Sequence, residues 1–128
     1  MYGSDGRVAV AVNISGVSDM ALFAEQTQDF LVAFFGHAKP FSHEELDDAS
    51  PVFFARKDAS VLIIHGEFDN IAYVQQADRG YESLKAAGAD VEYIRVSGAD
   101  GIMHGVPILK NPVAKNGLRN FLLTRLNK

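Results

Sequence analysis

The sequence predicts an α/β fold in which about three parallel strands are flanked by helices. Three segments, at residues 8–12, 61–64 and 91–96, have the length and the β-branched residues that are typical of strands. Amphipathic patterns of helical period separate these segments, and strands that alternate with helices form parallel sheets through right-handed crossovers. The 128 residues, 48% of them hydrophobic, are predicted to form a single domain over residues 1–128.

The first predicted strand is the apolar run Val8–Val12, which lies between two glycine-containing turns. Its uninterrupted apolar character is typical of a strand that is covered on both faces. One amphipathic helix is predicted to follow, with Asp19 as its N-cap and Gly36 as its C-cap, because apolar residues recur there every three or four positions. In the polar stretch after it, Ser42 is predicted to cap a short helix.

The second predicted strand, Val61–Ile64, is again apolar without alternation. A helix is predicted from Tyr73 onward, and Gly88 is expected to end it. The third strand, Val91–Val96, alternates between two faces, which is typical of a strand near the edge of a sheet. The dipeptide Asn111-Pro112 predicts the N-cap and the first residue of a final helix.

Composition excludes several classes of function. A net charge of -4 argues against nucleic acid and against an anionic membrane as partners, because binding to phosphates depends on clustered Lys and Arg. The chain has no cysteine, so disulfides and a thiolate nucleophile are excluded. No apolar run approaches the roughly 20 residues that span a bilayer, and the first residues lack the pattern of a signal peptide. We therefore expect a cytoplasmic protein.

Polar residues after the predicted strands indicate a functional site. The carboxyl ends of parallel strands meet at one edge of the sheet, where open α/β folds bind ligands, and Ser15, Asp69 and His104 all follow strands. An aspartate there accepts the Nδ1 proton of a histidine, which leaves Nε2 free to act as a general base. The alternative interpretation is that Asp69 belongs to a polar turn and that His104 is a surface residue.

Metal and nucleotide sites have less support. His65 with Asp69, or Asp100 with His104, would supply two ligands, but no third ligand is spaced to complete a zinc site. No Gly-x-Gly-x-x-Gly or Walker pattern follows a strand, so a nucleotide site has no support in the sequence. We expect neither a metal nor a cofactor.

Several segments carry a resemblance to a known family: Ala-Ser-Pro at 49–51, Ser-Val-Leu-Ile-Ile-His-Gly-Glu-Phe-Asp at 60–69, Tyr-Glu-Ser-Leu-Lys-Ala-Ala-Gly at 81–88, and the glycine-rich stretch 98–105. Together they resemble the C-terminal part of the α/β-hydrolases, in particular the carboxylesterases that are similar to prolyl-oligopeptidase-type serine peptidases. Residues 7–16 extend the resemblance over nearly the whole chain. It implies a truncated α/β-hydrolase fold in which Asp69 is the acid and His104 the histidine of a catalytic triad that cleaves small carboxylic esters.

The sequence departs from that family at the nucleophile. The family's serine lies in a Gly-x-Ser-x-Gly elbow, which these 128 residues do not contain. In the family, the elbow, the oxyanion-hole loop and five strands precede the segment that corresponds to Arg7. Ser15 is a weak candidate, because it lacks the glycine two positions before it and is interpreted as a turn serine. The loop from Gly98 to His104 is also longer than its counterpart in the family.

These departures lead to three hypotheses on function. The first is an esterase-like hydrolase that is weak or inactive on its own. The second is a non-catalytic protein that oligomerises or binds a small ligand, and the third is a flavodoxin-like ligand-binding domain in which Asp69 and His104 are incidental. Because one edge of the first strand would lack its partner strand, we also expect self-association, most simply as a twofold homodimer.

Overall fold

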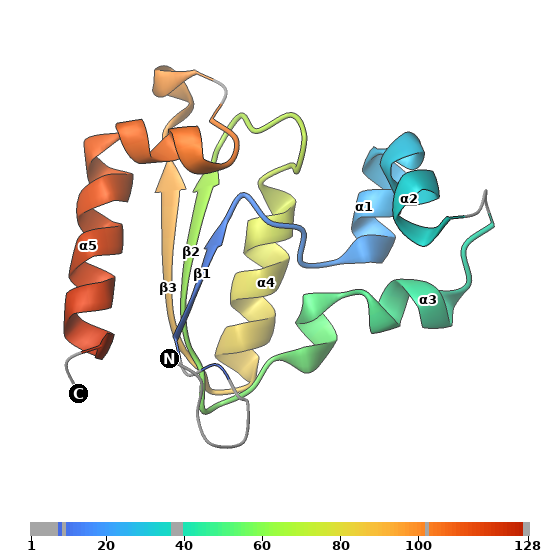
Figure 1. The fold of residues 1–128 in the computed structure, drawn as a ribbon, viewed down its shortest axis with the longest axis horizontal. Helices are drawn as coiled ribbons and strands as arrows, with labels where there is room; N and C mark the ends of the chain where they lie inside the picture. The colour runs from blue at the N-terminus through green and yellow to red at the C-terminus, as the bar shows by residue number, and fades with distance from the viewer. Residues whose placement is uncertain (1–7, 9, 37–39, 102, 127–128) are drawn as a thin grey trace.

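The structure, a computed structural model, describes residues 8, 10–36, 40–101 and 103–126. Its centre is a parallel sheet of three strands in the order β1 (Val10–Ile14), β2 (Ser60–Gly66) and β3 (Asp90–Val96) (Figure 1). The register places Ile64 of β2 between Ile14 of β1 and Ile94 of β3. The predicted α/β fold class is therefore confirmed.

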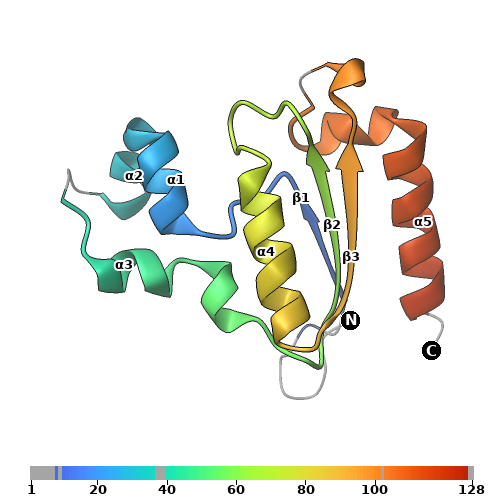
Figure 2. The same ribbon diagram turned by 180° about the vertical axis from the view of Figure 1, so that it is seen from behind.

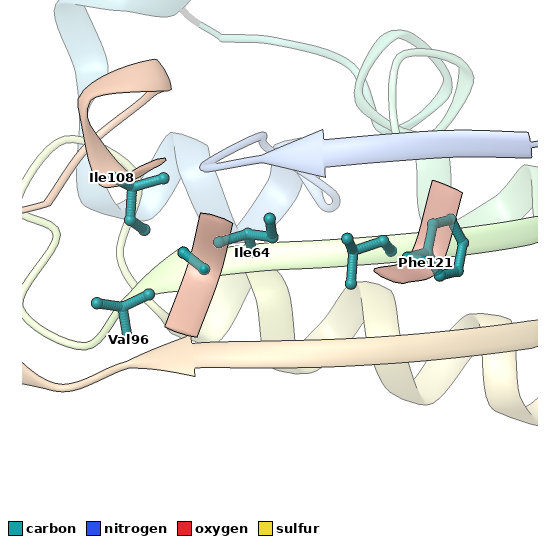
Figure 3. Close-up of a cluster of buried hydrophobic side chains, with 6 residues drawn as sticks. Ile64, Val96, Ile108 and Phe121 are labelled. Atoms are coloured by element: carbon teal, nitrogen blue, oxygen red, sulfur yellow. The ribbon is translucent and has the colours of Figure 1, made fainter. Parts of the chain in front are cut away.

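Helices cover both faces of this sheet. Helix α4 (Gln75–Ala86) connects β2 to β3 and lies on one face, and α5 (Pro112–Leu126) lies on the other (Figures 1 and 2). Alternate residues of β2 separate the two layers, because Leu62 and Ile64 pack toward α5 whereas Ile63 lies beside Gly80 of α4. The layer between the sheet and α5 forms the larger core, with buried Leu62, Ile64, Val96, Ile108, Ala114 and Phe121 (Figure 3).

The first strand differs from its prediction in position and in cover. It runs over Val10–Ile14 rather than Val8–Val12. The ladder continues to its end because the N–H of Ser15 still donates to the carbonyl of Ile64, and the strand stops where Ser15 takes a φ of 56°. Ala11 is exposed, so β1 is not covered on both faces as its apolar sequence suggested.

The predicted helix between Asp19 and Gly36 is two helices, α1 (Met20–Gln26) and α2 (Gln28–Phe35). Thr27 interrupts them with an extended backbone, φ -145° and ψ 103°. The break lets the chain turn back toward α3 (His43–Asp48), so that Phe23, Leu31 and Leu46 form a second buried cluster. Both predicted caps are confirmed, since Asp19 accepts from the N–H of Leu22 and Gly36 is left-handed.

The other predicted boundaries agree closely with the structure. Ser42 caps α3 in a capping box, and Gly88 has a positive φ just after α4. Asn111 Oδ1 accepts from the N–H groups of Val113 and Ala114 at the start of α5, as predicted. Three short 3-10 helices escaped prediction: η1 (Pro51–Phe54), η2 (Gly98–Asp100) and η3 (Val106–Lys110). No helix in the described ranges is long and apolar enough to cross a membrane.

Candidate active site

The Asp69 side chain lies in the loop that joins β2 to α4, and its environment fixes its orientation. The carboxylate is completely buried. Its Oδ1 accepts hydrogen bonds from the backbone N–H groups of Ile71 and Ala72, both at 3.0 Å. These two bonds come from the loop itself and provide the hydrogen bonds that a buried charged oxygen requires. The second oxygen, Oδ2, is therefore held in place for another partner.

That partner is His104, which enters from the loop after β3. Its Nδ1 lies 2.8 Å from Oδ2 of Asp69. Because a carboxylate only accepts, Nδ1 carries the proton of this hydrogen bond and Nε2 of the neutral ring is left free to accept a proton. The His104 side chain is 35% exposed, so other groups can approach it. The structure thus brings together the two residues that the sequence proposed as acid and base.

Two glycines allow the longer His104 loop to reach Asp69. A Cβ atom on Gly66 would lie 2.3 Å from the carbonyl oxygen of Met103, the residue just before His104. A Cβ atom on Gly98 would lie 2.5 Å from the ring of Phe68. Both loops leave the sheet at the same end (Figure 1). Gly66 lets their backbones approach closely, and Gly98 makes room for the Phe68 ring. Glu67 adds a direct tie, since its Oε2 accepts from the N–H of Gly98 at 3.0 Å.

Ser15 lies at the carboxyl end of β1, beside β2, as the topology predicted. Its φ of 56° is unusual for a residue other than glycine, and such backbone conformations concentrate at functional sites. Its Oγ atom is nevertheless buried, and it makes no hydrogen bond to any described residue. The structure therefore brings Ser15 near the site without connecting its hydroxyl to His104.

A cavity of about 280 Å³ adjoins His104 and Ser15. Its remaining walls are mostly apolar and come from α1, α2 and the loop that carries Asp69. The apolar side chains that line it include Met20, Phe23, Leu31, Phe34 and Ile71. His104 thus lines a space that suits an apolar group, while its Nδ1 is bound to a buried carboxylate.

Of the residue pairs considered for a metal, His65 and Asp69 are neighbours, with 3.6 Å between Nε2 and Oδ2, and the same Oδ2 accepts from His104. Asp100 Oδ2 instead accepts from the side-chain amide of Asn111, at 2.6 Å, outside the Asp69–His104 pair. Among the described residues there is no group of three or more His, Asp or Glu that could hold a metal ion.

The Ser15 turn and α1 are anchored to α4 by a polar network around Asp19. Gln76 Oε1 accepts from the N–H groups of Ser18 and Asp19, both at 2.9 Å. Burial alone would raise the pKa of the Asp19 carboxyl, but hydrogen bonds from Leu22 N–H and the Arg79 guanidinium outweigh burial and lower that pKa below its ordinary value. The walls of the cavity are therefore fixed to the α4 layer.

Sequence reasoning missed the burial of His65, which it considered only as part of a polar turn or as a metal ligand. The structure buries this imidazole completely, on the side of Asp69 away from solvent. The available signal was its position: it follows four apolar residues of β2 and lies on the same face as Ile63, two residues earlier. A histidine there has to find its hydrogen bonds inside the protein.

Comparisons with known proteins bear on the family and the fold of the chain. Residues 5–111 match the family model described as the prolyl oligopeptidase family. No curated protein sequence matches the chain. Several solved structures share its fold, and because their sequence identities to this chain are low, they inform on the fold alone.

A truncated form of a carbohydrate esterase from gut microbiota matches with a TM-score of 0.69 and 21% identity, over 96% of this chain and 44% of that one. A puromycin-hydrolysing peptidase from Mycobacterium tuberculosis matches with a TM-score of 0.69 and 22% identity, over 91% of this chain and 18% of that one. The acylaminoacyl peptidase of Pyrococcus horikoshii matches with a TM-score of 0.66 and 22% identity, over 92% of this chain and 20% of that one.

The chain thus spans less than half the length of each of these three proteins. The family model, by contrast, covers most of the chain, from the segment before β1 to the residue that caps α5. Sheet order, the connection through α4 and the placement of α5 are those of a partial α/β-hydrolase fold. This protein belongs to the prolyl oligopeptidase family of the α/β-hydrolases.

Proposed function

We propose that Asp69 and His104 are the acid and the general base of a hydrolase site that cleaves small carboxylic esters. The observation that carries this proposal is the 2.8 Å hydrogen bond from His104 Nδ1 to Asp69 Oδ2, beside an apolar cavity that His104 lines. In such a site Nε2 takes the proton of the oxygen that attacks the carbonyl carbon. It then returns that proton to the leaving group, while the aspartate stabilises the imidazolium.

The cavity beside His104 supports an acyl compound as the substrate. Its volume of about 280 Å³ and its apolar walls fit a short acyl chain or a small apolar side chain. The proteins that share the fold are named as an esterase and as peptidases, and both classes hydrolyse acyl compounds. These names support the reaction class, while the choice of a small ester rests on the size of the cavity.

We propose further that Ser15 is not the nucleophile. A serine that attacks a substrate has its Oγ within hydrogen-bond reach of the base, whereas Ser15 Oγ is buried and has no partner among the described residues. Hydrolysis at full rate would then need a nucleophile and oxyanion donors that the 128 residues do not visibly supply. Loss of a single oxyanion donor costs on the order of a hundredfold in rate, so the chain on its own should be a weak catalyst.

The direct test measures hydrolysis of a nitrophenyl acetate ester by the wild type, His104→Ala and His43→Ala. His43 is the exposed first residue of α3 and controls for the reactivity of surface imidazoles. We expect His104→Ala to lower the protein-dependent rate about a hundredfold, the low end of what a positioned general base contributes. His43→Ala should keep the wild-type rate. Equal rates in all three proteins would contradict the proposal.

A fluorophosphonate probe, which bonds covalently to an activated serine, tests the claim about Ser15. We expect no labelling of the 128-residue chain that depends on Ser15, and so no difference between the wild type and Ser15→Ala. Labelling that disappears both in Ser15→Ala and in His104→Ala would identify Ser15 as the nucleophile and would overturn this part of the proposal.

One observation favours a second candidate, a non-catalytic protein that self-associates. Strand β1 pairs with β2 on one side, and no described strand pairs with its other side. An open edge of a parallel sheet offers unpaired backbone groups to another chain. Self-association together with an ester-hydrolysis rate that does not depend on His104 would favour this candidate over the hydrolase.

A further inference from the structure

We propose that His65 is a positioning residue that holds the Asp69 carboxylate in place for His104. The proposal deepens the proposed function, because it rests on Asp69 and His104 acting as a pair. His65 is the penultimate residue of β2, and its imidazole is completely buried. It touches the loop that carries Asp69 from within the protein.

The first contact is with the backbone of Ala72. Nε2 of His65 lies 2.6 Å from the carbonyl oxygen of Ala72. Because a carbonyl oxygen only accepts, Nε2 must carry the proton and donate it. Ala72 in turn donates its own N–H to Oδ1 of Asp69, at 3.0 Å. His65 therefore holds Ala72 in place, and Ala72 in turn holds Oδ1 of Asp69.

The second contact is with the carboxylate itself. Nε2 of His65 lies 3.6 Å from Oδ2 of Asp69, the same atom that accepts from His104. This distance is too long for a good hydrogen bond, but a buried N–H dipole so close to a carboxylate oxygen favours its negative charge. Two imidazoles thus lie against one oxygen atom, His65 from the buried side and His104 from the cavity side.

The geometry also selects one tautomer of His65. Its Nδ1 atom is buried and has no hydrogen-bond partner among the described residues. A proton on that atom would have no acceptor there, and an unpaired buried donor is costly. The Nε2–H tautomer therefore satisfies the contact with Ala72 and leaves the unpaired position as a bare nitrogen.

A histidine suits position 65 because its Nε2–H reaches across the loop that carries Asp69 to the carbonyl of Ala72. The loop leaves β2 at Gly66 and returns to the sheet side at Ala72, so a donor on His65 closes it from within. The Nε2 amide group of glutamine reaches about as far as the Nε2–H of histidine, which makes His65→Gln the conservative variant. Leucine has a comparable apolar volume and no donor, so His65→Leu removes the contact while filling the space.

The test is an NMR measurement of ring protonation on uniformly ¹⁵N-labelled protein, at alkaline pH where a neutral imidazole carries one proton. In the wild type we expect His65 as the Nε2–H tautomer and His104 as the Nδ1–H tautomer. In His65→Leu we expect His104 to lose its preference for Nδ1–H, because Asp69 is no longer held. In His65→Gln the His104 preference should be retained. The ester-hydrolysis rate should likewise fall in His65→Leu and stay close to the wild-type rate in His65→Gln.

The outcomes separate this inference from the proposed function. A folded His65→Leu variant in which His104 keeps the wild-type tautomer and the wild-type rate would overturn the role of His65 while leaving the acid–base pair intact. A wild-type His65 with its proton on Nδ1 would also overturn it, even if His65→Leu failed to fold. A wild-type His104 without any preference for Nδ1–H would overturn both proposals together.

Discussion

Nδ1 of His104 lies 2.8 Å from Oδ2 of Asp69, although 35 positions separate the two residues in the sequence. The parallel sheet explains this meeting, because β2 and β3 are neighbours and end at the same edge. Their connecting loops then lie side by side, with Gly66 under the backbone of Met103. The pair is thus a product of the topology and of one close backbone contact.

The substitution Asp69→Asn should switch the tautomer of His104, so that the ring proton moves from Nδ1 to Nε2. The side-chain oxygen of asparagine can still accept from the N–H groups of Ile71 and Ala72, which places the amide NH₂ where Oδ2 was. That group donates, so His104 Nδ1 has to accept and its proton moves to Nε2. Ester hydrolysis should then fall to the level of His104→Ala. A rate close to that of the wild type would count against a role for the acid.

The substitution Gly66→Ala should separate the two loops. An added Cβ would lie 2.3 Å from the carbonyl oxygen of Met103, so one backbone has to move. We expect the free energy of unfolding to fall by about 1–3 kcal/mol, the usual cost of overpacking a buried site, together with loss of His104-dependent hydrolysis. Gly101→Ala is the matched control, because a Cβ there would meet no atom within 4 Å, although its φ of 87° adds some strain. Urea unfolding of both variants measures the difference, which should be clearly larger for Gly66→Ala.

The Asp19 carboxyl should contribute stability that depends on pH. Burial raises its pKa, but the bonds from Leu22 N–H and Arg79 lower the pKa below the ordinary value of 3.8. A group with a lowered pKa in the folded state stabilises above its unfolded pKa and loses that contribution as the pH falls through the folded value. The gap in unfolding free energy between wild type and Asp19→Asn should thus be largest near neutral pH and shrink below pH 3.8.

Arg79→Gln supplies the control for that measurement. Arg79 donates to Oδ2 of Asp19 at 3.0 Å. If this contact is a main source of the lowered pKa, the pH-dependent gap should be smaller when Asp19→Asn is made in the Arg79→Gln background. A gap of the same size in both backgrounds would assign the effect to the backbone cap alone.

Self-association through β1 is a further expectation. A twofold axis at the open edge would pair β1 with the β1 of a second copy in antiparallel orientation. The exposed Phe34 of α2, 62% accessible, lies on the same side of the molecule as the Ser15 turn, since both line the cavity. We expect a dimer at micromolar concentration in analytical ultracentrifugation, weakened in Phe34→Asp but not in Val113→Asp on α5. A monomer in the wild type would refute this expectation.

Much of the fold was predictable because apolar periodicity and caps act locally. Asp19, Ser42 and Asn111 each satisfy free N–H groups at a helix start, as their positions indicated. The break at Thr27 was not predictable in this way, since the apolar pattern continues across it. It forms because the chain has to turn so that Leu31 can reach the cluster with Phe23 and Leu46, which is a tertiary requirement.

The two residues of the candidate site could be named from the sequence, but their contacts could not. The order of strand, aspartate, strand and histidine pointed to Asp69 and His104. Their contact could not be predicted, because the His104 loop is long and its approach depends on the close packing of Met103 against Gly66. His65 was missed because its partner is the carbonyl of Ala72, and a backbone acceptor leaves no pattern in the sequence. The burial of Ser15 Oγ likewise depends on packing from several segments.

The protonation of the His104 ring tests the central claim most directly. Long-range ¹H–¹⁵N NMR spectra of the wild type at alkaline pH show which ring nitrogen carries the single proton, and exposed His43 serves as an internal reference in the same spectrum. Because Nδ1 donates to Asp69, the account predicts His104 as the Nδ1–H tautomer, with a switch to Nε2–H in Asp69→Asn. A His104 ring that matches His43 in the wild type, and does not change in Asp69→Asn, would contradict the account.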